Sequence, residues 1–173
     1  MADKKLRAGV IGARLGAAHA YAYANSSEYE LVAVCDLFPK VIDEMWERAK
    51  LPEGSVRTYT DYKEMFEKEN LDVVSVTVPD HLHADPVCDA ADAGIKGVFS
   101  EKPLTINLED ADRIIDTVNR NGTKMSVDHT RSFVPVFREA RESVRNGDLG
   151  GLTRIVAHMG GHRSMLFRNG THI

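Results

Sequence analysis

The sequence predicts an α/β fold in which helices flank a doubly wound parallel sheet. Two observations lead to this prediction. Short apolar runs rich in β-branched residues alternate with amphipathic stretches about a dozen residues long, which is the pattern of successive βα units. In addition, a glycine-containing turn around Gly12 joins the first apolar run to the first amphipathic stretch.

The individual strands and helices follow from this alternation. We expect five or six strands, at residues 7–11, 30–35, 57–59, 72–78, 97–99 and 124–127. Helical patterns lie between them, at residues 16–25, 39–50, 62–69, 84–93 and 108–121. Pro39 suits a first helical turn, and Asn107 can cap a helix together with Asp110. Gly94 and Gly122 suit the left-handed position just past a helix end.

The regular alternation of strand-like and helical stretches ends after Val127, which predicts a second domain. The chain continues with a helical stretch at 136–146, a glycine-rich turn at 147–151 and a strand-like run at 152–158. One strand and one loop are too little to bury the face of a sheet. We therefore expect a complete domain at residues 1–128, followed at 129–173 by the truncated start of an α/β C-terminal domain.

The overall composition argues against two classes of partner. The 173 residues carry a formal net charge of -4 without a basic excess, which favours neither nucleic acid nor an anionic membrane. The N-terminus lacks the apolar core and cleavage site of a signal peptide, and no segment resembles a transmembrane span, so we expect a cytoplasmic protein. Cys35 and Cys88 lie in apolar stretches without a CxxC pair, which indicates that they are packing residues.

The turn after the first strand has the position of a dinucleotide-binding fingerprint, and this makes the predicted sheet Rossmann-type. Gly12 would allow the tight turn, and Gly16 or Ala17 would let the helix pack close to the strand. The match is incomplete, because Arg14 replaces the middle glycine and the next glycine comes one residue early. On its own the turn is weak evidence, since similar glycines also occur in turns that bind nothing.

A carboxylate at the end of the second strand strengthens the case for a nucleotide. The free N–H groups at the helix start, at Ala13, Arg14 and Leu15, would meet a pyrophosphate. Asp36 follows Gly12 at the spacing of an acid that accepts hydrogen bonds from an adenosine ribose diol. Asp36 could instead help to cap the next helix. We favour the ribose role, because a capping residue has no reason to respect that spacing.

The same acid bears on the choice between NAD and NADP. Asp36 would repel a 2′-phosphate, and the adjacent Leu37 and Phe38 offer no positive charge. NAD is therefore the expected cofactor. Arg14 and Lys40 keep NADP open as an alternative.

The tripeptide Glu101-Lys102-Pro103 places a cation just after the fifth predicted strand. Ligands of open α/β sheets bind outside the carboxyl ends of the strands. A lysine held there between an acid and a proline is well placed to meet a substrate. The alternative interpretation is a surface lysine at a turn.

Five features in order resemble the Gfo/Idh/MocA family of oxidoreductases, which includes glucose-fructose oxidoreductase and inositol dehydrogenase. They are the glycine turn at Gly12, then Asp36, the Pro-x-x-x-His stretch from Pro79 to His83, Glu101-Lys102-Pro103, and the segment Arg131-Ser132-Phe133-Val134-Pro135. The resemblance covers essentially the whole chain. It implies an N-terminal NAD(P)-binding Rossmann domain and a C-terminal α/β domain, which shapes the substrate pocket and commonly forms a homo-oligomer.

The resemblance also implies which residues face the cofactor and substrate. Val78, Pro79 and His83 after the fourth strand, together with Glu101 and Lys102 after the fifth, would border the cofactor. Lys102 would be the family lysine, hydrogen-bonded to the reacting hydroxyl or carbonyl near the nicotinamide.

A second catalytic residue is implied near the end of the sequence. His172 corresponds to a family histidine that acts as acid or base on the substrate hydroxyl. The family often places an aspartate four residues earlier, where this chain has Arg168, and that change puts the histidine's orientation in doubt. Arg168 could instead engage an anionic substrate.

Other histidines invite a metal hypothesis, which we do not favour. His158 and His162 fall in a strand-like run, where they would lie roughly 13 Å apart. His81 and His83 are better explained as loop residues beside the cofactor or as residues at the entry to the next helix. No metal site is expected.

Two functions remain open from the sequence. The first is an NAD(P)-dependent dehydrogenase or reductase that transfers a hydride between nicotinamide and a sugar, polyol or related hydroxy compound. The second is a truncated nucleotide-binding module without turnover, because the expected second domain is incomplete and a closed site is needed to exclude water.

Overall fold

The computed structural model describes residues 4–156, 158, 167–168 and 171–172. The chain divides into two compact units, Met1–His129 and Thr130–Ile173. Within the described residues, no helix has both the length and the apolar character needed to cross a membrane.

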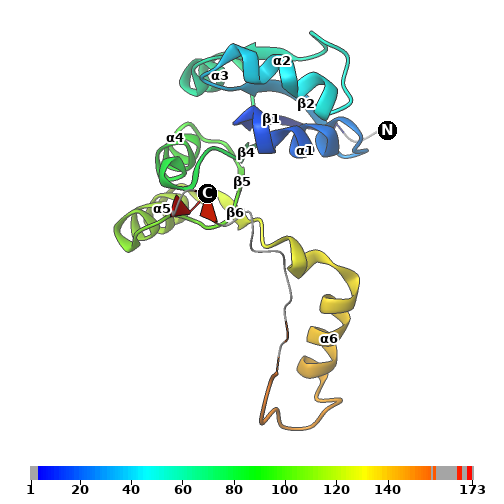
Figure 1. Cartoon of the computed structure of the whole chain (residues 1–173). Coiled ribbons are helices and arrows are strands. Elements are labelled where there is room, and N and C mark those ends of the chain that lie inside the picture. Colours follow the sequence, from blue (N-terminus) through cyan, green and yellow to red (C-terminus); the bar gives the residue numbers. More distant parts are fainter. Residues whose placement is uncertain (1–3, 157, 159–166, 169–170, 173) are drawn as a thin grey trace. The chain divides into compact units, whose positions relative to one another are not determined.

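The first unit contains a six-stranded parallel sheet (Figure 1). The strands are β1 (Leu6–Ile11), β2 (Tyr29–Cys35), β3 (Arg57–Tyr59), β4 (Val73–Val76), β5 (Gly97–Ser100) and β6 (Lys124–Val127). Their order is β3-β2-β1-β4-β5-β6, so the direction of winding reverses between β1 and β4. A reversal of this kind is the point at which open α/β sheets bind ligands. The predicted doubly wound Rossmann sheet is therefore confirmed.

Helices connect successive strands, and several begin or end at the predicted signals. They are α1 (Ala13–Ala24), α2 (Pro39–Arg48), α3 (Tyr62–Lys68), the 3-10 turn η1 (Asp80–Leu82), α4 (Ala84–Asp92) and α5 (Leu108–Asn121). The side chain of Asn107 accepts a hydrogen bond from the Asp110 amide at the start of α5. Gly122 ends that helix with a φ of 69°, in the left-handed region that favours glycine.

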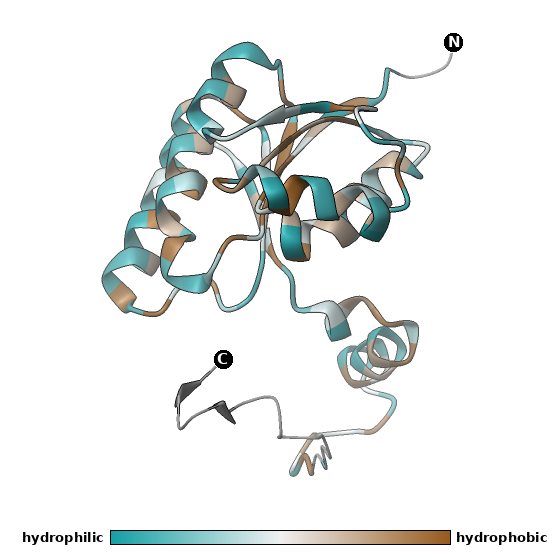
Figure 2. Ribbon diagram, turned by 45° about the horizontal axis from the view of Figure 1, so that its top comes forward, coloured by the Kyte–Doolittle hydropathy of each residue, from teal (hydrophilic) through white to brown (hydrophobic). Residues whose placement is uncertain are grey.

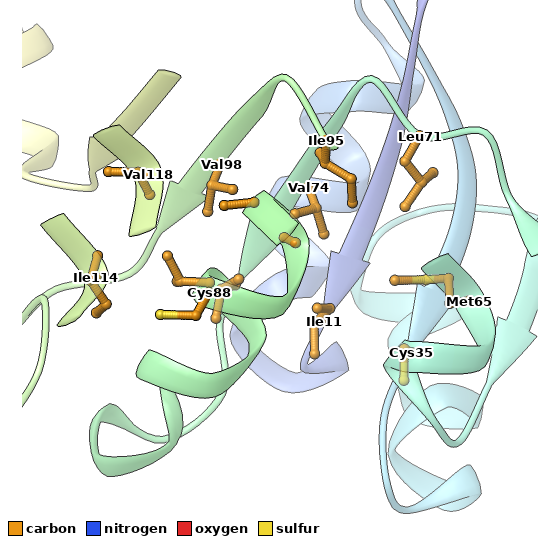
Figure 3. Close-up of a cluster of buried hydrophobic side chains, with 14 of the residues drawn as sticks. Ile11, Cys35, Met65, Leu71, Val74, Cys88, Ile95, Val98, Ile114 and Val118 are labelled. Carbon is orange, nitrogen blue, oxygen red and sulfur yellow. The ribbon is translucent and has the colours of Figure 1, made fainter. Parts of the chain in front are cut away.

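Two hydrophobic clusters hold the helices to the sheet. One joins α1 and α2 to the sheet around Val10, Met45 and Trp46. The other lies beneath α3, α4 and α5 and includes Ile11 and Val87; Figure 3 shows part of it. Consecutive strand residues point to opposite faces, so Val10 and Ile11 serve different clusters. The helix ribbons carry both hydrophilic and hydrophobic residues, as amphipathic helices do (Figure 2).

The second unit is smaller. It contains the 3-10 turn η2 (Thr130–Phe133), the helix α6 (Pro135–Asn146) and an antiparallel pair, β7 (Phe167–Arg168) with β8 (Thr171–His172). Gly147 ends α6 with a φ of 80°.

The structure corrects three sequence-based boundaries. α1 begins at Ala13 rather than at residue 16, because Gly12 turns the chain directly from strand into helix. β4 is four residues long rather than seven. The strand expected at 152–158 is wrong for the described residues, since 152–156 and 158 belong to no strand. An apolar run becomes a strand only with a hydrogen-bonding neighbour, and none pairs with it in the described part of the chain.

Candidate cofactor and catalytic site

The turn after β1 is packed so closely that it requires glycine. Gly12 has a φ of 92°, and a Cβ there would lie 2.8 Å from the carbonyl carbon and oxygen of Thr77. A Cβ on Gly16 would lie 2.5 Å from Val10 Cγ1 and 2.7 Å from Thr77 Oγ1. Gly16 is thus the residue that lets α1 approach the sheet, which resolves the choice between Gly16 and Ala17. Because Gly12 and Gly16 have no side chains, the start of α1 can pack against the end of β4.

The first turn of α1 faces the carboxyl edge of the sheet. Gly12 provides no side-chain cap, and the Ala13 amide donates a hydrogen bond of 2.8 Å to Asp36 Oδ2. Arg14 and Leu15 are exposed and line a cavity at this edge. A helix start carries a partial positive charge and amides without intrahelical acceptors. The turn can therefore bind an anion through the backbone.

Asp36 lies where β2 ends, beside the turn. Its Oδ2 accepts from Ala13, and its Oδ1 accepts from the Phe38 amide at 3.0 Å. Phe38 is itself the N-cap residue of α2, and its side chain makes no capping bond. The carboxylate thus accepts an amide hydrogen bond at the start of each of two helices, α1 and α2, which fits the alternative in which it helps to cap the next helix, while the ribose contact stays a prediction. Each carboxylate oxygen can accept more than one hydrogen bond, so capacity for hydroxyl donors remains.

A cavity of about 690 Å³ opens between these turns and the loop after β4. Its volume falls within the range of small-molecule sites, which is roughly 300–1,000 Å³. Its apolar wall includes Leu37, Phe38, Val41, Val78, Pro79 and Leu82. Asp36 and Arg14 also line it. Asp61 and Asp85 line it as well, so the cavity combines an apolar wall with three carboxylates, one guanidinium group and the start of a helix.

Two ionisable groups of this cavity are held in their neutral forms. Burial raises the pKa of the Cys35 thiol to about 12. Burial also raises the pKa of Tyr62, whose hydroxyl donates to Asp89 Oδ2 at 2.8 Å. Neither group supplies acid–base chemistry near neutral pH. This part of the edge is built for binding, and Cys35 acts as the packing residue that we expected.

The loop after β5 carries the lysine. The Glu101 amide donates to the carbonyl oxygen of Val76 at 2.8 Å, so the loop leaves the sheet beside the end of β4. The Lys102 amide donates to Glu101 Oε2 at 3.0 Å, and the Lys102–Pro103 peptide bond is cis. The Lys102 side chain is exposed. The lysine therefore sits at the strand next to the reversal point, separate from the lining of the cavity.

His83 is not among the residues that line the cavity, and its contact with the cofactor stays a prediction. The residue is 1% exposed and begins α4. Its Nε2 lies 2.8 Å from the carbonyl oxygen of Val78, and its Nδ1 lies 2.9 Å from that of Pro103 and 3.2 Å from that of Leu104. Both ring nitrogens thus face backbone carbonyl oxygens, and the nitrogen that carries the proton donates the hydrogen bond; both donate only in the imidazolium form. The other interpretation, a residue at the entry to a helix, is confirmed.

His19 is a site residue that the sequence analysis missed. Its Nδ1 lies 3.0 Å from Ser75 Oγ, and its Nε2 lies 3.8 Å from Glu101 Oε1 and 4.0 Å from Asp128 Oδ2. Burial lowers the pKa of His19, against the opposing effect of the two carboxylates. The sequence does contain one signal for this position: His19 follows Gly16 by three residues, which puts both on the sheet-facing side of α1.

Of the two candidate metal pairs from the sequence, the structure describes in full only that of His81 and His83, which lie in different surroundings. His81 is exposed and lies next to Asp80, whereas His83 is buried against carbonyl groups. His162 lies outside the described residues. The structure instead brings potential ligand atoms of His19, Glu101 and Asp128 within 4.8 Å of one another. Sequence spacing gave no hint of this set, because the three residues come from α1 and from two strand ends.

The second predicted catalytic residue belongs to the other unit. The backbone of His172 pairs with Phe167, and that of Arg168 pairs with Thr171. The side chains of His172 and Arg168 lie outside what the structure describes. The role of His172 therefore stays a prediction.

Comparison with known proteins places this arrangement in a family. The sequence model of the Gfo/Idh/MocA oxidoreductase family, NAD-binding Rossmann fold, matches residues 6–129. The chain belongs to this family. The predicted resemblance and the NAD-binding Rossmann domain are thus confirmed.

Individual relatives extend the match beyond the Rossmann unit. The chain is 32% identical over 149 residues to the rhizopine catabolism protein MocA of Rhizobium meliloti, covering 86% of this chain and 45% of that protein. It is 34% identical over 146 residues to myo-inositol 2-dehydrogenase of Thermotoga maritima, covering 84% and 42%. Among solved structures, scyllo-inositol dehydrogenase from Lactobacillus casei, with bound NAD(H) and scyllo-inositol, superposes with a TM-score of 0.74 at 25% identity, covering 85% of this chain and 43% of that one. The chain spans less than half the length of these relatives.

Proposed function

We propose that this Gfo/Idh/MocA chain binds NAD and serves an oxidoreductase that transfers a hydride between nicotinamide and a polyol or sugar. The observation that carries the proposal is the reversal point of the sheet, where the Gly12 turn, the Asp36 carboxylate and the Lys102 loop share one edge. The substrate class follows from relatives that are named inositol dehydrogenases.

The residues of the edge fit NAD in three ways. The turn at Gly12 packs against the Thr77 backbone and brings the amides of Arg14 and Leu15 at the start of α1 to the pyrophosphate, whereas the predicted Ala13 amide is held by Asp36. Asp36 accepts from the ribose hydroxyls. The apolar wall that includes Val78 and Pro79 packs against a planar ring.

The same residues favour NAD over NADP. A 2′-phosphate would come close to the Asp36 carboxylate, and Leu37 and Phe38 beside it are exposed and uncharged. Arg14 is the cation that lines the cavity and lessens this discrimination.

The chemistry of the site centres on Lys102. When bound, NAD supplies the nicotinamide ring that accepts or returns the hydride. The Lys102 ammonium donates a hydrogen bond to the substrate oxygen and stabilises the negative charge that develops on it. Glu101 accepts from the Lys102 amide and so fixes the backbone from which that side chain extends. His172, by family resemblance, takes or returns the hydroxyl proton.

A second candidate function is nucleotide binding without turnover. It is favoured by the Rossmann unit, which contains all six strands of the sheet that forms the cofactor edge. The complete protein is further proposed to be cytoplasmic and to form a homo-oligomer. Light scattering after size-exclusion chromatography tests the oligomeric state.

Turnover assays distinguish the two functions. We expect the chain to form NADH from NAD⁺ and myo-inositol, measured by absorbance, and Lys102→Ala to lower this rate about a hundredfold or more. Because Lys102 lies outside the cavity lining, its replacement should leave the NADH dissociation constant within about threefold.

The matched control is Lys68→Ala, which removes an exposed lysine on α3 that pairs with Glu64. It should alter neither quantity. Binding of NADH without oxidation of any polyol would favour the module without turnover, and a fully active Lys102→Ala chain would remove the lysine from the mechanism.

A further inference from the structure

Two loops that the proposed function needs converge on one buried side chain. The loop after β4 brings Val78 and Pro79 to the wall of the cavity, and the loop after β5 carries Lys102. The ring of His83 lies between them, within hydrogen-bond distance of Val78 on one side and of Pro103 and Leu104 on the other. His83 itself is on neither loop, since it opens α4.

The backbone hydrogen bonds of the sheet hold the loop after β5 only at its first residue, Glu101. The last bond to β4 is made by the Glu101 amide. Pro103 has no N–H to donate, so its carbonyl group is its sole backbone hydrogen-bonding group. Pro103 is an exposed residue, and the contact between its carbonyl oxygen and the buried ring of His83 is made at 2.9 Å from Nδ1. The imidazole of His83 thus contacts the Pro103 carbonyl group, as the amide of a neighbouring strand would do within a sheet.

We propose that His83 is a positioning residue, which fixes the loop of Lys102 relative to the cofactor wall at Val78 and Pro79. It touches neither the cavity nor the lysine side chain, and acts through the backbone carbonyl groups on both sides. This inference rests on the proposed function, because the distance that His83 maintains is the distance between the bound cofactor and the catalytic lysine.

Amide hydrogen exchange on the 173-residue chain tests the proposal without an activity assay. In His83→Phe the ring volume is kept while both nitrogens are lost. We expect exchange at residues 101–106 to become about tenfold faster or more, with the amides of β1, β4 and β5 unchanged. A purely structural role would instead accelerate exchange throughout the sheet.

Two smaller amides separate the two sides of the ring. The Asn side-chain nitrogen occupies the approximate position of Nδ1, and the Gln side-chain nitrogen that of Nε2. His83→Asn should therefore retain more of the protection at residues 101–106 than His83→Gln does. These variants also keep the test decisive if His83→Phe does not fold. The control is His81→Phe, at an exposed neighbour in η1.

The outcomes distinguish this inference from the proposed function. If wild type binds NADH, and if the His83 variants bind it within about threefold while the loop exchanges faster, both proposals stand. If wild type binds NADH but the loop exchanges at the same rate in every His83 variant, or if Asn and Gln rescue equally, the positioning role is overturned and the proposed function survives. Wild type that fails to bind NADH overturns the proposed function itself.

Discussion

The turn after β1 and the loop after β5 reach the same edge of the sheet but are held there differently. At the turn, the backbone of Gly12 lies against the backbone of Thr77 with no room for a side chain. At the loop, the neighbouring Glu101 carboxylate accepts from the Lys102 amide, and the buried ring of His83 faces the carbonyl groups of Pro103 and Leu104. The proposed binding function thus depends on backbone fit, and the proposed catalytic function depends on tertiary side-chain contacts.

The largest expected effect is at the turn. Gly12→Ala combines a positive φ with a collision against backbone atoms that cannot move aside. We expect a loss of about 2–4 kcal/mol in the free energy of unfolding, measured in urea, and loss of NADH binding. Gly54→Ala is the matched control, because Gly54 has a φ of 71° with nothing within 4 Å of a Cβ. It should cost about 1 kcal/mol from conformation alone. Equal losses in the two variants would contradict the backbone fit.

A smaller effect is expected at Asp36, where a side chain contributes to the turn. Asp36→Asn keeps the shape but removes the charge that faces the proposed ribose and repels a 2′-phosphate. We expect NADH affinity to fall about tenfold and the preference for NADH over NADPH to shrink, both measured by fluorescence titration. An unchanged preference would argue against the ribose contact.

The smallest effect concerns pH and the side chains near the loop. Burial lowers the pKa of His19 in the folded chain, so the unfolded chain binds a proton first as the pH falls. The stability that His19 contributes is therefore fully present above its ordinary pKa near 6.5 and declines as the pH drops through that value. Urea titrations should show a decline of at most about 1.4 kcal/mol per pH unit, reduced in His19→Asn. Identical pH profiles for the two chains would contradict a buried neutral imidazole.

This contrast also explains what the sequence could predict. Glycine spacing, apolar alternation and capping residues are local signals, and they predicted the sheet, most helix boundaries and the turn at Gly12. His19 and His83 depend on contacts between elements far apart in the chain, such as His83 with Pro103. Local spacing places His19 on the sheet-facing side of α1, but no local pattern specifies the distant residues that either histidine contacts. The strand expected at 152–158 failed for a related reason, because strand formation needs a partner and its own residues do not specify one.

The central claim is that NAD binds at the reversal point of the sheet, on the Gly12 turn and Asp36. The most direct test is an amide NMR titration of the 173-residue chain with NADH. We predict saturable one-to-one binding with the largest shifts at residues 12–15 and at Asp36, and small shifts at β3 and at the far end of α5. Absence of saturation, or shifts centred away from residues 12–15, would contradict the account.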